Sequence, residues 1–172
     1  MWILSIFSIA LPGLAYATPD NTGAPFLNIK HYNKHANQQD ELRCLALNIY
    51  FEARSESKTG QFAVAAVTMN RVASRKYPNS ICKVVWQRRQ FSWTHDGKSD
   101  RPRDKKSWEK AKAIASLVYD NFFKFQKISN GAWDITRGAL HYYAPDIVNP
   151  HWAKKTGSKK KIGGHIFLSE NS

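Results

Sequence analysis

The chain has 172 residues, a length that suits one domain with a short extension and is too short for two ordinary domains. With 42% hydrophobic residues and only 9 Gly and 7 Pro, the composition supports a hydrophobic core and excludes a fibrous or disordered protein. The formal net charge of +13 predicts an anionic partner. Charge alone does not distinguish nucleic acid, an acidic membrane and an acidic polymer.

The N-terminal segment has the features of an export signal. Residues 1–17 carry no charged side chain and end in Ala15-Tyr16-Ala17, the small-x-small pattern of a signal-peptidase site. This run is too short to span a bilayer comfortably. We therefore expect a signal peptide over 1–17, a flexible arm over 18–37 and a folded domain over 38–172, in a periplasmic or extracellular protein. The alternatives are an uncleaved segment that anchors the chain to a membrane and, less favoured, a buried N-terminal helix.

The chain contains two cysteines, Cys44 and Cys82. In an exported protein an even number of cysteines is typical of disulfide pairing. We expect a bridge between them, which would close a loop of about 38 residues and stabilise the fold by roughly 3 to 4 kcal/mol. Without export, the alternative is two buried thiols.

Apolar periodicity predicts four helices before residue 130. The first begins with Asp40 as its N-cap, and the second begins at Lys58 or Thr59 and stops at Tyr77-Pro78. After a short third helix comes a polar loop over 87–103, and loops of this length commonly carry function. The fourth helix has apolar residues at Trp108, Ala111, Ala115, Val118 and Phe122.

The composition favours strands after residue 130. Segments 139–143 and 162–168 are β-prone, and we expect them to form a C-terminal β-hairpin. The lysines between 154 and 161 are expected to lie in a solvated loop. The predicted fold class is therefore α+β, mainly helical, with a C-terminal β-hairpin.

Two glutamates fall on the apolar side of the first predicted helix. At about 100° per residue, Glu52 lies on the same stripe as Leu45 and Ile49, and so does Glu56 if the helix continues that far. Burial disfavours the charged form of a carboxylate and raises its pKa, which is how a general acid is made. The alternative is a buried ion pair, for which the candidate partners are Arg43, Arg54 and Arg71.

These glutamates belong to a longer pattern of motifs. The pattern includes Cys44-Leu-Ala-Leu-Asn-Ile-Tyr-Phe-Glu52-Ala-Arg-Ser-Glu56, Asn70-Arg71-Val72, Gln90-Phe91-Ser92-Trp93, Gly138-Ala-Leu-His141-Tyr142-Tyr143 and Ile162-Gly163-Gly164-His165-Ile166-Phe167. Spread over nearly all of 41–167, it resembles the SleB-type cell wall hydrolases, the family of spore cortex-lytic enzymes. One departure is Ser55, where the family usually has Gly.

The resemblance implies a lysozyme-like helical domain that cleaves peptidoglycan between N-acetylmuramic acid and N-acetylglucosamine, with Glu52 as the catalytic acid. We interpret Glu56 as a supporting residue that raises the pKa of Glu52 or orients it, or else as half of a structural ion pair. A single acid protonates the glycosidic oxygen and then acts as a base. If it deprotonates the muramic acid 6-hydroxyl, the product is the 1,6-anhydro sugar of a lytic transglycosylase, the outcome we favour.

The alternative outcome is hydrolysis, in which the same glutamate activates water and the enzyme is a muramidase. A second carboxylate would then be useful. The fold would have to supply it from Asp96, Asp134 or Asp146.

Amides, hydroxyls and aromatic rings are the groups that bind sugars, and the motifs contain several. The candidate substrate-binding residues are Gln61, Asn70, Phe91, Ser92, Trp93, His141, Tyr142 and Tyr143. Alternation along a strand places His141 and Tyr143 on one face and Tyr142 on the other, so these three do not all line one groove. For the remaining candidates the alternative is ordinary packing or a solvated helix face.

Other activities fit the sequence less well. His141, His151 and His165 suggest a zinc peptidase, but their spacings of 10 and 14 match no compact ligand motif. Both cysteines lie in predicted apolar helices, which does not favour a cysteine peptidase. The basic residues are scattered and form no nucleic-acid-binding motif. We therefore expect a monomer that needs no metal or other cofactor and binds peptidoglycan glycan strands, not nucleic acid.

The export signal makes a direct prediction about the mature chain. Because signal peptidase cleaves after the small-x-small pattern, the mature protein is expected to begin at Thr18. Intact mass spectrometry of protein isolated from its native compartment measures this. A chain that retains residues 1–17 would instead support the membrane anchor.

Overall fold

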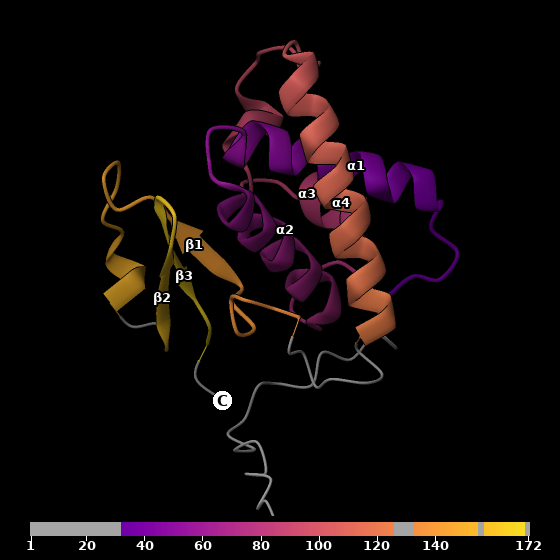
Figure 1. The fold of residues 1–172 in the computed structure, drawn as a ribbon. Coiled ribbons are helices and arrows are strands. Elements are labelled where there is room, and N and C mark those ends of the chain that lie inside the picture. The colour runs from indigo at the N-terminus through magenta and orange to yellow at the C-terminus, as the bar shows by residue number, and fades with distance from the viewer. Residues whose placement is uncertain (1–31, 126–132, 155–156, 171–172) are drawn as a thin grey trace, which may run out of the picture.

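The computed structural model describes residues 32–125, 133–154 and 157–170 (Figure 1). The predicted signal peptide and residues 18–31 of the predicted arm lie outside the described residues. The helices come first in the chain: α1 (Gln38–Ala53), α2 (Lys58–Ala73), α3 (Ile81–Val85), the 3₁₀ turn η2 (Ser92–His95) and α4 (Lys105–Phe125). They are followed by β1 (His141–Tyr143), the 3₁₀ turn η3 (His151–Lys154), β2 (Lys159–Ile162) and β3 (His165–Leu168). The expected α+β, mainly helical fold is confirmed.

Side-chain caps define where the first two helices begin. The cap of α1 is Asn37, whose Oδ1 accepts hydrogen bonds from the backbone N–H groups of Gln39 (2.9 Å) and Asp40 (3.4 Å). The prediction that Asp40 caps this helix was therefore wrong by three residues; both are good caps, and periodicity does not choose between them. Ser57 caps α2 by accepting from the N–H of Gly60 at 3.2 Å.

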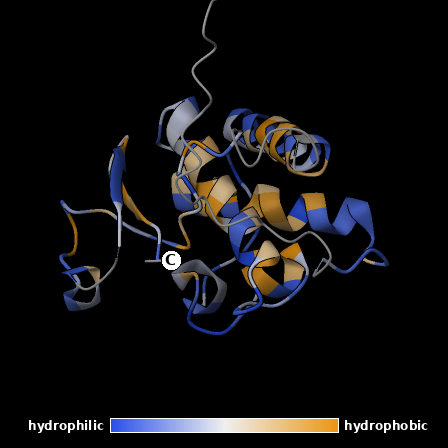
Figure 2. Ribbon diagram, turned by 90° about the horizontal axis from the view of Figure 1, so that it is seen from below, coloured by the Kyte–Doolittle hydropathy of each residue, from blue (hydrophilic) through white to orange (hydrophobic). Residues whose placement is uncertain are grey.

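The helix α2 lies at the centre of the domain. It contacts α1, α3 and α4 as well as strands β1 and β2, so the sheet stands beside the helices and is attached through α2 (Figure 1). Alanines of α1 and α2, such as Ala46 and Ala65, are almost completely buried and belong to the main hydrophobic core. The apolar faces of the helices point toward one another (Figure 2). None of the described helices is long and apolar enough to cross a membrane.

A second, smaller core joins α2 to the sheet. It includes Val64 and Val67 of α2 and Phe167 of β3, all at most 1% exposed. Burial of such side chains contributes about 1.5 to 3 kcal/mol each. The sheet is therefore anchored by hydrophobic packing on the same helix that supports α1.

The sheet has three antiparallel strands in the order β1-β3-β2. The two segments predicted to pair do so, with Tyr142 opposite Phe167. The lysine-rich segment, however, is not the predicted solvated loop. Lys159–Ile162 forms β2, an edge strand that makes a tight hairpin with β3. Lysines suit this position because Lys159 and Lys161 are exposed and charged edges resist pairing with other chains.

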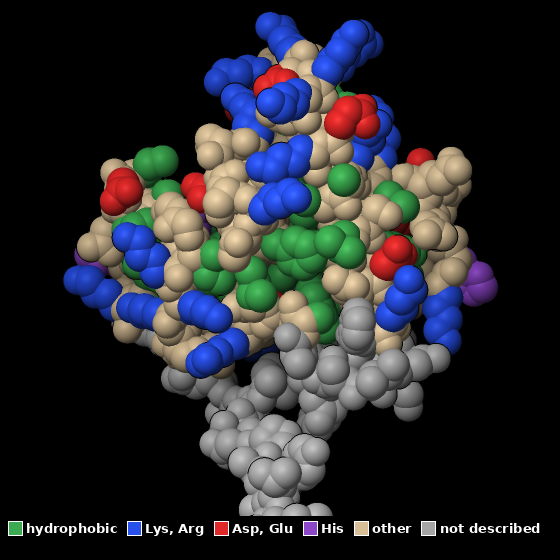
Figure 3. Space-filling model, viewed as in Figure 1, with side chains coloured by type: hydrophobic (Ala, Val, Ile, Leu, Met, Phe, Trp, Pro, Cys, Tyr) green, Lys and Arg blue, Asp and Glu red, His purple; other side chains and the backbone are tan. Residues whose placement is uncertain are grey.

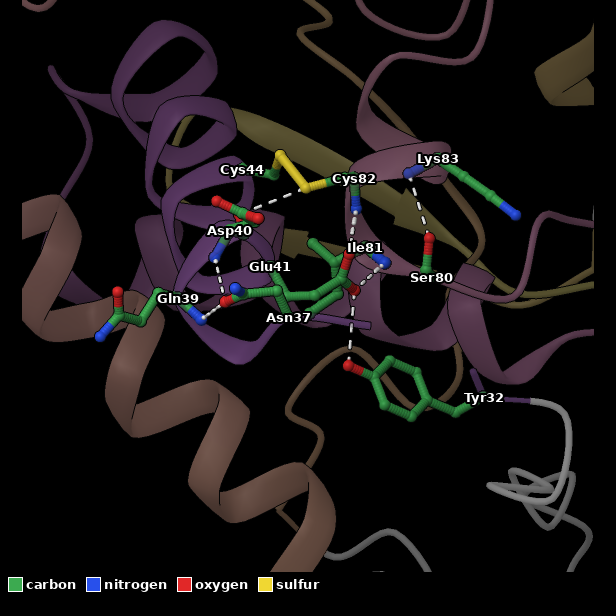
Figure 4. The surroundings of a disulfide bond; sticks show 10 residues. All are labelled: Tyr32, Asn37, Gln39, Asp40, Glu41, Cys44, Ser80, Ile81, Cys82 and Lys83. Atoms are coloured by element: carbon green, nitrogen blue, oxygen red, sulfur yellow. Dashed lines mark hydrogen bonds between the residues drawn. A yellow bond between two sulfur atoms is a disulfide. The ribbon is translucent and has the colours of Figure 1, made fainter. Parts of the chain in front are cut away.

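The N-terminal end of α1 is joined to α3 by a buried carboxylate and a disulfide (Figure 4). Glu41 is 3% exposed, and its carboxylate accepts hydrogen bonds from the N–H groups of Ile81 (2.5 Å) and Cys82 (3.2 Å) in the first turn of α3. Tyr32 donates to the same carboxylate at 3.5 Å, so the described part of the predicted arm packs onto the domain. Cys44, on the same side of α1, is bonded to Cys82, which confirms the predicted disulfide.

Removal of the disulfide is expected to lower the free energy of unfolding by about 4 kcal/mol, because the bridge joins residues 38 positions apart and restricts the unfolded chain. The test is chemical denaturation of the Cys44→Ser/Cys82→Ser variant beside the wild type. As a control, reductant should destabilise the wild type and leave the variant unchanged. Equal midpoints for the two proteins would contradict this account.

Candidate active site

Glu52 lies in the last turn of α1, where the helix end meets the sheet. Its Oε2 accepts a hydrogen bond of 2.9 Å from the hydroxyl of Tyr142 on β1. The two side chains share a groove of about 320 Å³. The groove is lined by Glu52, Arg71, Arg89, Gln90, Phe91, Ser92, His95 and Tyr142.

The surroundings of Glu52 favour its protonated form. Burial raises the pKa of this carboxyl above its ordinary value, and this effect exceeds the opposing influences of the Tyr142 hydrogen bond and the Arg71 charge. A carboxyl that keeps its proton to higher pH and lines a groove is able to donate that proton to a bound molecule. The acid inferred from the apolar stripe therefore has the expected environment.

Arg71 is not an ion-pair partner of Glu52. None of the ion pairs found among the described residues includes either side chain. Instead, the Nε of Arg71 donates to the carbonyl oxygen of Leu140 at 2.8 Å, and the guanidinium lies between the rings of Tyr77 and Phe91, 5.3 and 5.2 Å from their centroids. Arg71 therefore lowers the pKa of Glu52 through the electrostatic effect of its charge, without forming an ion pair with it.

Strand β1 presents alternate side chains to opposite faces, as predicted. Tyr142 faces Glu52, and burial together with the Glu52 charge raises the pKa of its hydroxyl well above the usual value. The rings of His141 and Tyr143 lie beside Trp152, with centroids 5.5 and 6.1 Å away. Of these three candidates, the structure brings only Tyr142 into the groove.

Two other predicted sugar-binding residues lie in the interior. Asn70 has no exposed surface, and its Nδ2 donates to Asp134 (2.8 Å) and to the carbonyl oxygen of Ala139 (3.1 Å). Gln61 is 2% exposed and donates to the carbonyl oxygen of Glu56 at 3.1 Å. The structure places both amides away from the groove, where they connect elements of the fold.

The loop after α3 supplies one wall of the groove. Phe91 and Ser92 line it, whereas Trp93 is 7% exposed, donates from Nε1 to the Oδ1 of Asn48 at 3.2 Å and stacks on Phe51. Trp93 is therefore packed in the interior, as the alternative to a sugar-binding role expected. The groove residues Arg89, Gln90 and His95 were not predicted as site residues, although all three lie within the polar loop over 87–103 expected to carry function.

Glu56 does not lie on α1, because the helix ends at Ala53. Its Oε2 accepts from the N–H of Gly164 at 3.1 Å, and its Oε1 lies 3.6 Å from the Nδ1 of His165. A Cβ at Gly60 or Gly164 would lie 2.9 or 2.8 Å from these oxygens, so the glycines leave room for the carboxylate. Glu56 thus attaches the β2–β3 turn to the α1–α2 turn.

The contacts of Glu56 reach Glu52 only indirectly. The ring of His165 lies edge-on to Tyr142, with centroids 5.4 Å apart, and Tyr142 in turn bonds to Glu52. Burial lowers the pKa of His165, and the Glu56 charge partly offsets this. Glu56 therefore contacts the strand that carries His165 and is linked to Glu52 through His165 and Tyr142.

The three aspartates considered as second carboxylates do not line the groove. Asp134 is 6% exposed and accepts from Asn70, from the N–H and hydroxyl of Thr136 and from the N–H of Gly138. Asp96 is exposed and lies near Lys98, and Asp146 is exposed. In the part of the chain that the structure describes, Glu52 is the one carboxylate of this groove. The same residues contain no cluster of three His, Cys, Asp or Glu side chains able to hold a metal ion.

A wider depression of about 560 Å³ lies at the other end of α1, beside the disulfide. Its charged side chains, which include Asp40, Arg43 and Arg101, are exposed to solvent or nearly so. The smaller groove is the better candidate site because it holds a partly buried carboxyl with a raised pKa.

Residues 55–168 match the Cell Wall Hydrolase family, and the chain belongs to this family. It is similar to the spore cortex-lytic enzyme of Bacillus cereus, with 34% identity over 129 residues, which is 75% of this chain and 44% of that protein. Similarity to the spore cortex-lytic enzyme of Bacillus subtilis strain 168 is 33% over 128 residues, 74% of this chain and 37% of that protein. The chain thus spans less than half the length of these curated relatives.

Two solved structures have the same fold. The catalytic domain of the germination-specific lytic transglycosylase SleB from Bacillus anthracis superposes with a TM-score of 0.62 and 31% identity, covering 80% of this chain and 99% of that domain. The catalytic domain of the Bacillus cereus SleB protein superposes with a TM-score of 0.61 and 31% identity, covering 78% of this chain and 94% of that domain. The family predicted from the motifs is therefore confirmed, and so is the prediction of an enzyme.

Replacement of Tyr142 by Phe is expected to raise the pKa of Glu52 further, because the hydroxyl donates to the carboxylate and so stabilises its charged form. Carbon-detected NMR titration of labelled glutamate carboxyls measures the shift without a substrate. Tyr143→Phe, which removes a hydroxyl from the opposite face of β1, is the matched control and should leave Glu52 unchanged. A lower pKa in Tyr142→Phe would contradict the assigned bond.

Proposed function

We propose that this chain is a peptidoglycan glycosidase that cleaves the bond between N-acetylmuramic acid and N-acetylglucosamine, with Glu52 as its single acid and base. The observation that carries the proposal is the raised pKa of Glu52 in a groove with no second carboxylate among the described residues. The similarity to spore cortex-lytic enzymes and to the SleB lytic transglycosylase domain supports the same activity.

In the first step, Glu52 donates its proton to the glycosidic oxygen as the bond from that oxygen to the anomeric carbon of muramic acid breaks. The N-acetylglucosamine side leaves as an alcohol and takes the proton with it. Tyr142 holds the carboxyl through one oxygen, which leaves the other oxygen to face the substrate. As charge develops on the carboxylate, the Tyr142 hydroxyl and the Arg71 field stabilise it.

In the second step, the Glu52 carboxylate removes the proton of the muramic acid 6-hydroxyl while that oxygen bonds to the anomeric carbon. The product is a 1,6-anhydro sugar, no water is consumed, and Glu52 recovers its proton. We favour this lytic transglycosylase outcome because two-carboxylate glycosidases use their second group as a nucleophile or to activate water. The alternative is a hydrolytic muramidase in which Glu52 activates water itself.

We propose that Glu56 is a positioning residue. Its carboxylate holds the β2–β3 turn, and through His165 it keeps the Tyr142 ring against Glu52. Phe91 and Ser92 are the proposed sugar contacts of the loop wall, and Tyr142 contacts the sugar from the sheet.

The proposed partner is the anionic glycan strand, met by an exported monomer outside the cytoplasm. The charge of +13 favours an acidic polymer. On the face shown in Figure 3, Lys and Arg side chains form separate groups over the helices and the sheet, with few acidic side chains between them. This distribution suits a polymer that carries many carboxylates better than it suits one nucleic-acid duplex.

Glu52→Gln is expected to reduce the rate of peptidoglycan cleavage by a factor of about 10² to 10⁴, because the amide has no proton to donate. The variant should be at least as stable as the wild type at neutral pH. Because the folded-state pKa of Glu52 is raised, the wild type loses stability as pH rises through that pKa, and the amide does not. Turbidity assays and thermal melts from pH 4 to 8 test both statements.

Glu56→Gln is the comparison variant. It retains an oxygen that accepts from Gly164, so it should keep partial activity with an altered pH optimum. Mass spectrometry of the wild-type products distinguishes anhydro ends from reducing ends. An inactive, folded Glu56→Gln beside an active Glu52→Gln would reverse the assignment, and cleaved stem peptides would replace the glycosidase by a peptidase.

A further inference from the structure

Arg71 is a buried cation that pairs with no carboxylate among the described residues. It is 5% exposed, and none of the ion pairs in the described part of the chain includes it. Its Nε is bonded to the Leu140 carbonyl, but its Nη1 is buried with no hydrogen-bond partner among the described residues. Burying a charge without an anion is costly, and stacking between two rings offsets only part of that cost.

Glu52 lines the same groove but forms no ion pair with Arg71 among the described residues. The charge of Arg71 reaches the groove, since it acts to lower the pKa values of Glu52 and Tyr142, which both line it. Before a substrate binds, the groove is therefore positively charged at the end where Arg71 lies.

A second arginine lines the same groove in an unusual backbone conformation. Arg89 has a φ of 64°, the left-handed region that residues other than Gly, Asn and Asp rarely adopt. The turn that contains it is closed by a hydrogen bond of 3.1 Å from the N–H of Gln90 to the carbonyl oxygen of Gln87. Its side chain is exposed and takes part in none of the described ion pairs. Strained residues of this kind cluster at ligand sites.

We propose that Arg71 and Arg89 form a carboxylate subsite that binds the acidic 3-O-lactyl arm of muramic acid. This proposal rests on the proposed function and adds the basis of its selectivity. The carboxylate is that of the bare lactyl group or the first carboxylate of an attached stem peptide. Arg89 makes the direct contact, and Arg71 provides the fixed buried charge behind it.

The subsite accounts for which sugar lies on the bond-breaking side of Glu52. The two sugars of the repeat differ only by the lactyl arm, so a carboxylate site in the groove selects muramic acid for this position. The bound anion also offsets the positive charge of the guanidinium groups beside the reacting sugar.

The test compares stem-free glycan strands that carry free lactyl carboxylates with the same strands after amidation of those carboxylates. The variant is Arg89→Gln, chosen because the exposed Arg89 side chain is not needed for packing. Arg88→Gln is the matched control: it makes the same change in charge at the exposed neighbouring residue, which does not line the groove. Dissociation constants are measured in the Glu52→Gln background, and KM and kcat in the active enzyme.

Arg89→Gln is expected to weaken binding of the free-carboxylate strand and raise its KM by about tenfold or more, as for loss of a charged hydrogen bond, with little change in kcat. On amidated strands, Arg89→Gln and the parent should be equal. Arg88→Gln should resemble the parent on both substrates. Stem-bearing strands identify the source of the carboxylate, because an Arg89 effect that persists on them assigns the stem carboxylate and one that disappears assigns the bare lactyl group.

Equal affinity of the parent for free and amidated stem-free strands, together with no Arg89 effect on stem-bearing strands, would overturn the subsite, and so would equal effects of the Arg88 and Arg89 substitutions. Failure of the proposed function looks different. In that case the enzyme cleaves neither strand, while the dissociation constants of the Arg88→Gln and Arg89→Gln variants still show whether the carboxylate subsite exists.

Discussion

A single hydrogen bond, from the Tyr142 hydroxyl to the Glu52 carboxyl, joins the helical part of the domain to the sheet at the candidate site. Much of the surrounding structure serves to bring these two groups together. Asn70 and Arg71, neighbours on α2, bind the segment that leads into β1 through the carbonyl oxygens of Ala139 and Leu140. Asn70, predicted as a sugar ligand, thus has a different place in the fold: it helps to set the position of the strand that carries Tyr142.

The same constraint explains the contacts on the other side of the sheet. Strand β3 pairs with β1, so any movement of the β2–β3 turn would shift Tyr142 as well. Glu56 holds this turn at Gly164, and glycines line the space that its carboxylate occupies. Burial, one hydrogen bond and one distant cation together set the pKa of Glu52, and all three depend on the sheet remaining in place.

The features that the sequence predicted well are those that depend on residues close together in the chain. Apolar periodicity located the helices, and alternation along 139–143 separated Tyr142 from its neighbours. The apolar stripe predicted that Glu52 is buried, with either a raised pKa or an ion-pair partner, and the structure shows the raised pKa. The sequence was less reliable at element ends, where Asn37 and Asp40 are equally good caps. It also left open whether Glu56 belongs to α1, because periodicity alone does not show that the helix stops at Ala53. Lys159–Ile162 resembled a loop because an edge strand tolerates charge.

The sequence by itself determined the family, the fold class, the disulfide pair and the residue types that the candidate site contains, since these follow from short-range pattern and from motifs. Only the tertiary structure decided which of those residues share the groove. Asn70 and Gln61 are polar side chains that the sequence alone does not distinguish from surface residues, and only packing buries them. Arg71 and Arg89 are two of the 26 basic residues, and only packing places both in the groove with Glu52. The physical reason is that long-range contacts, not local preference, determine whether a polar side chain satisfies its hydrogen bonds inside the protein or remains available to a ligand.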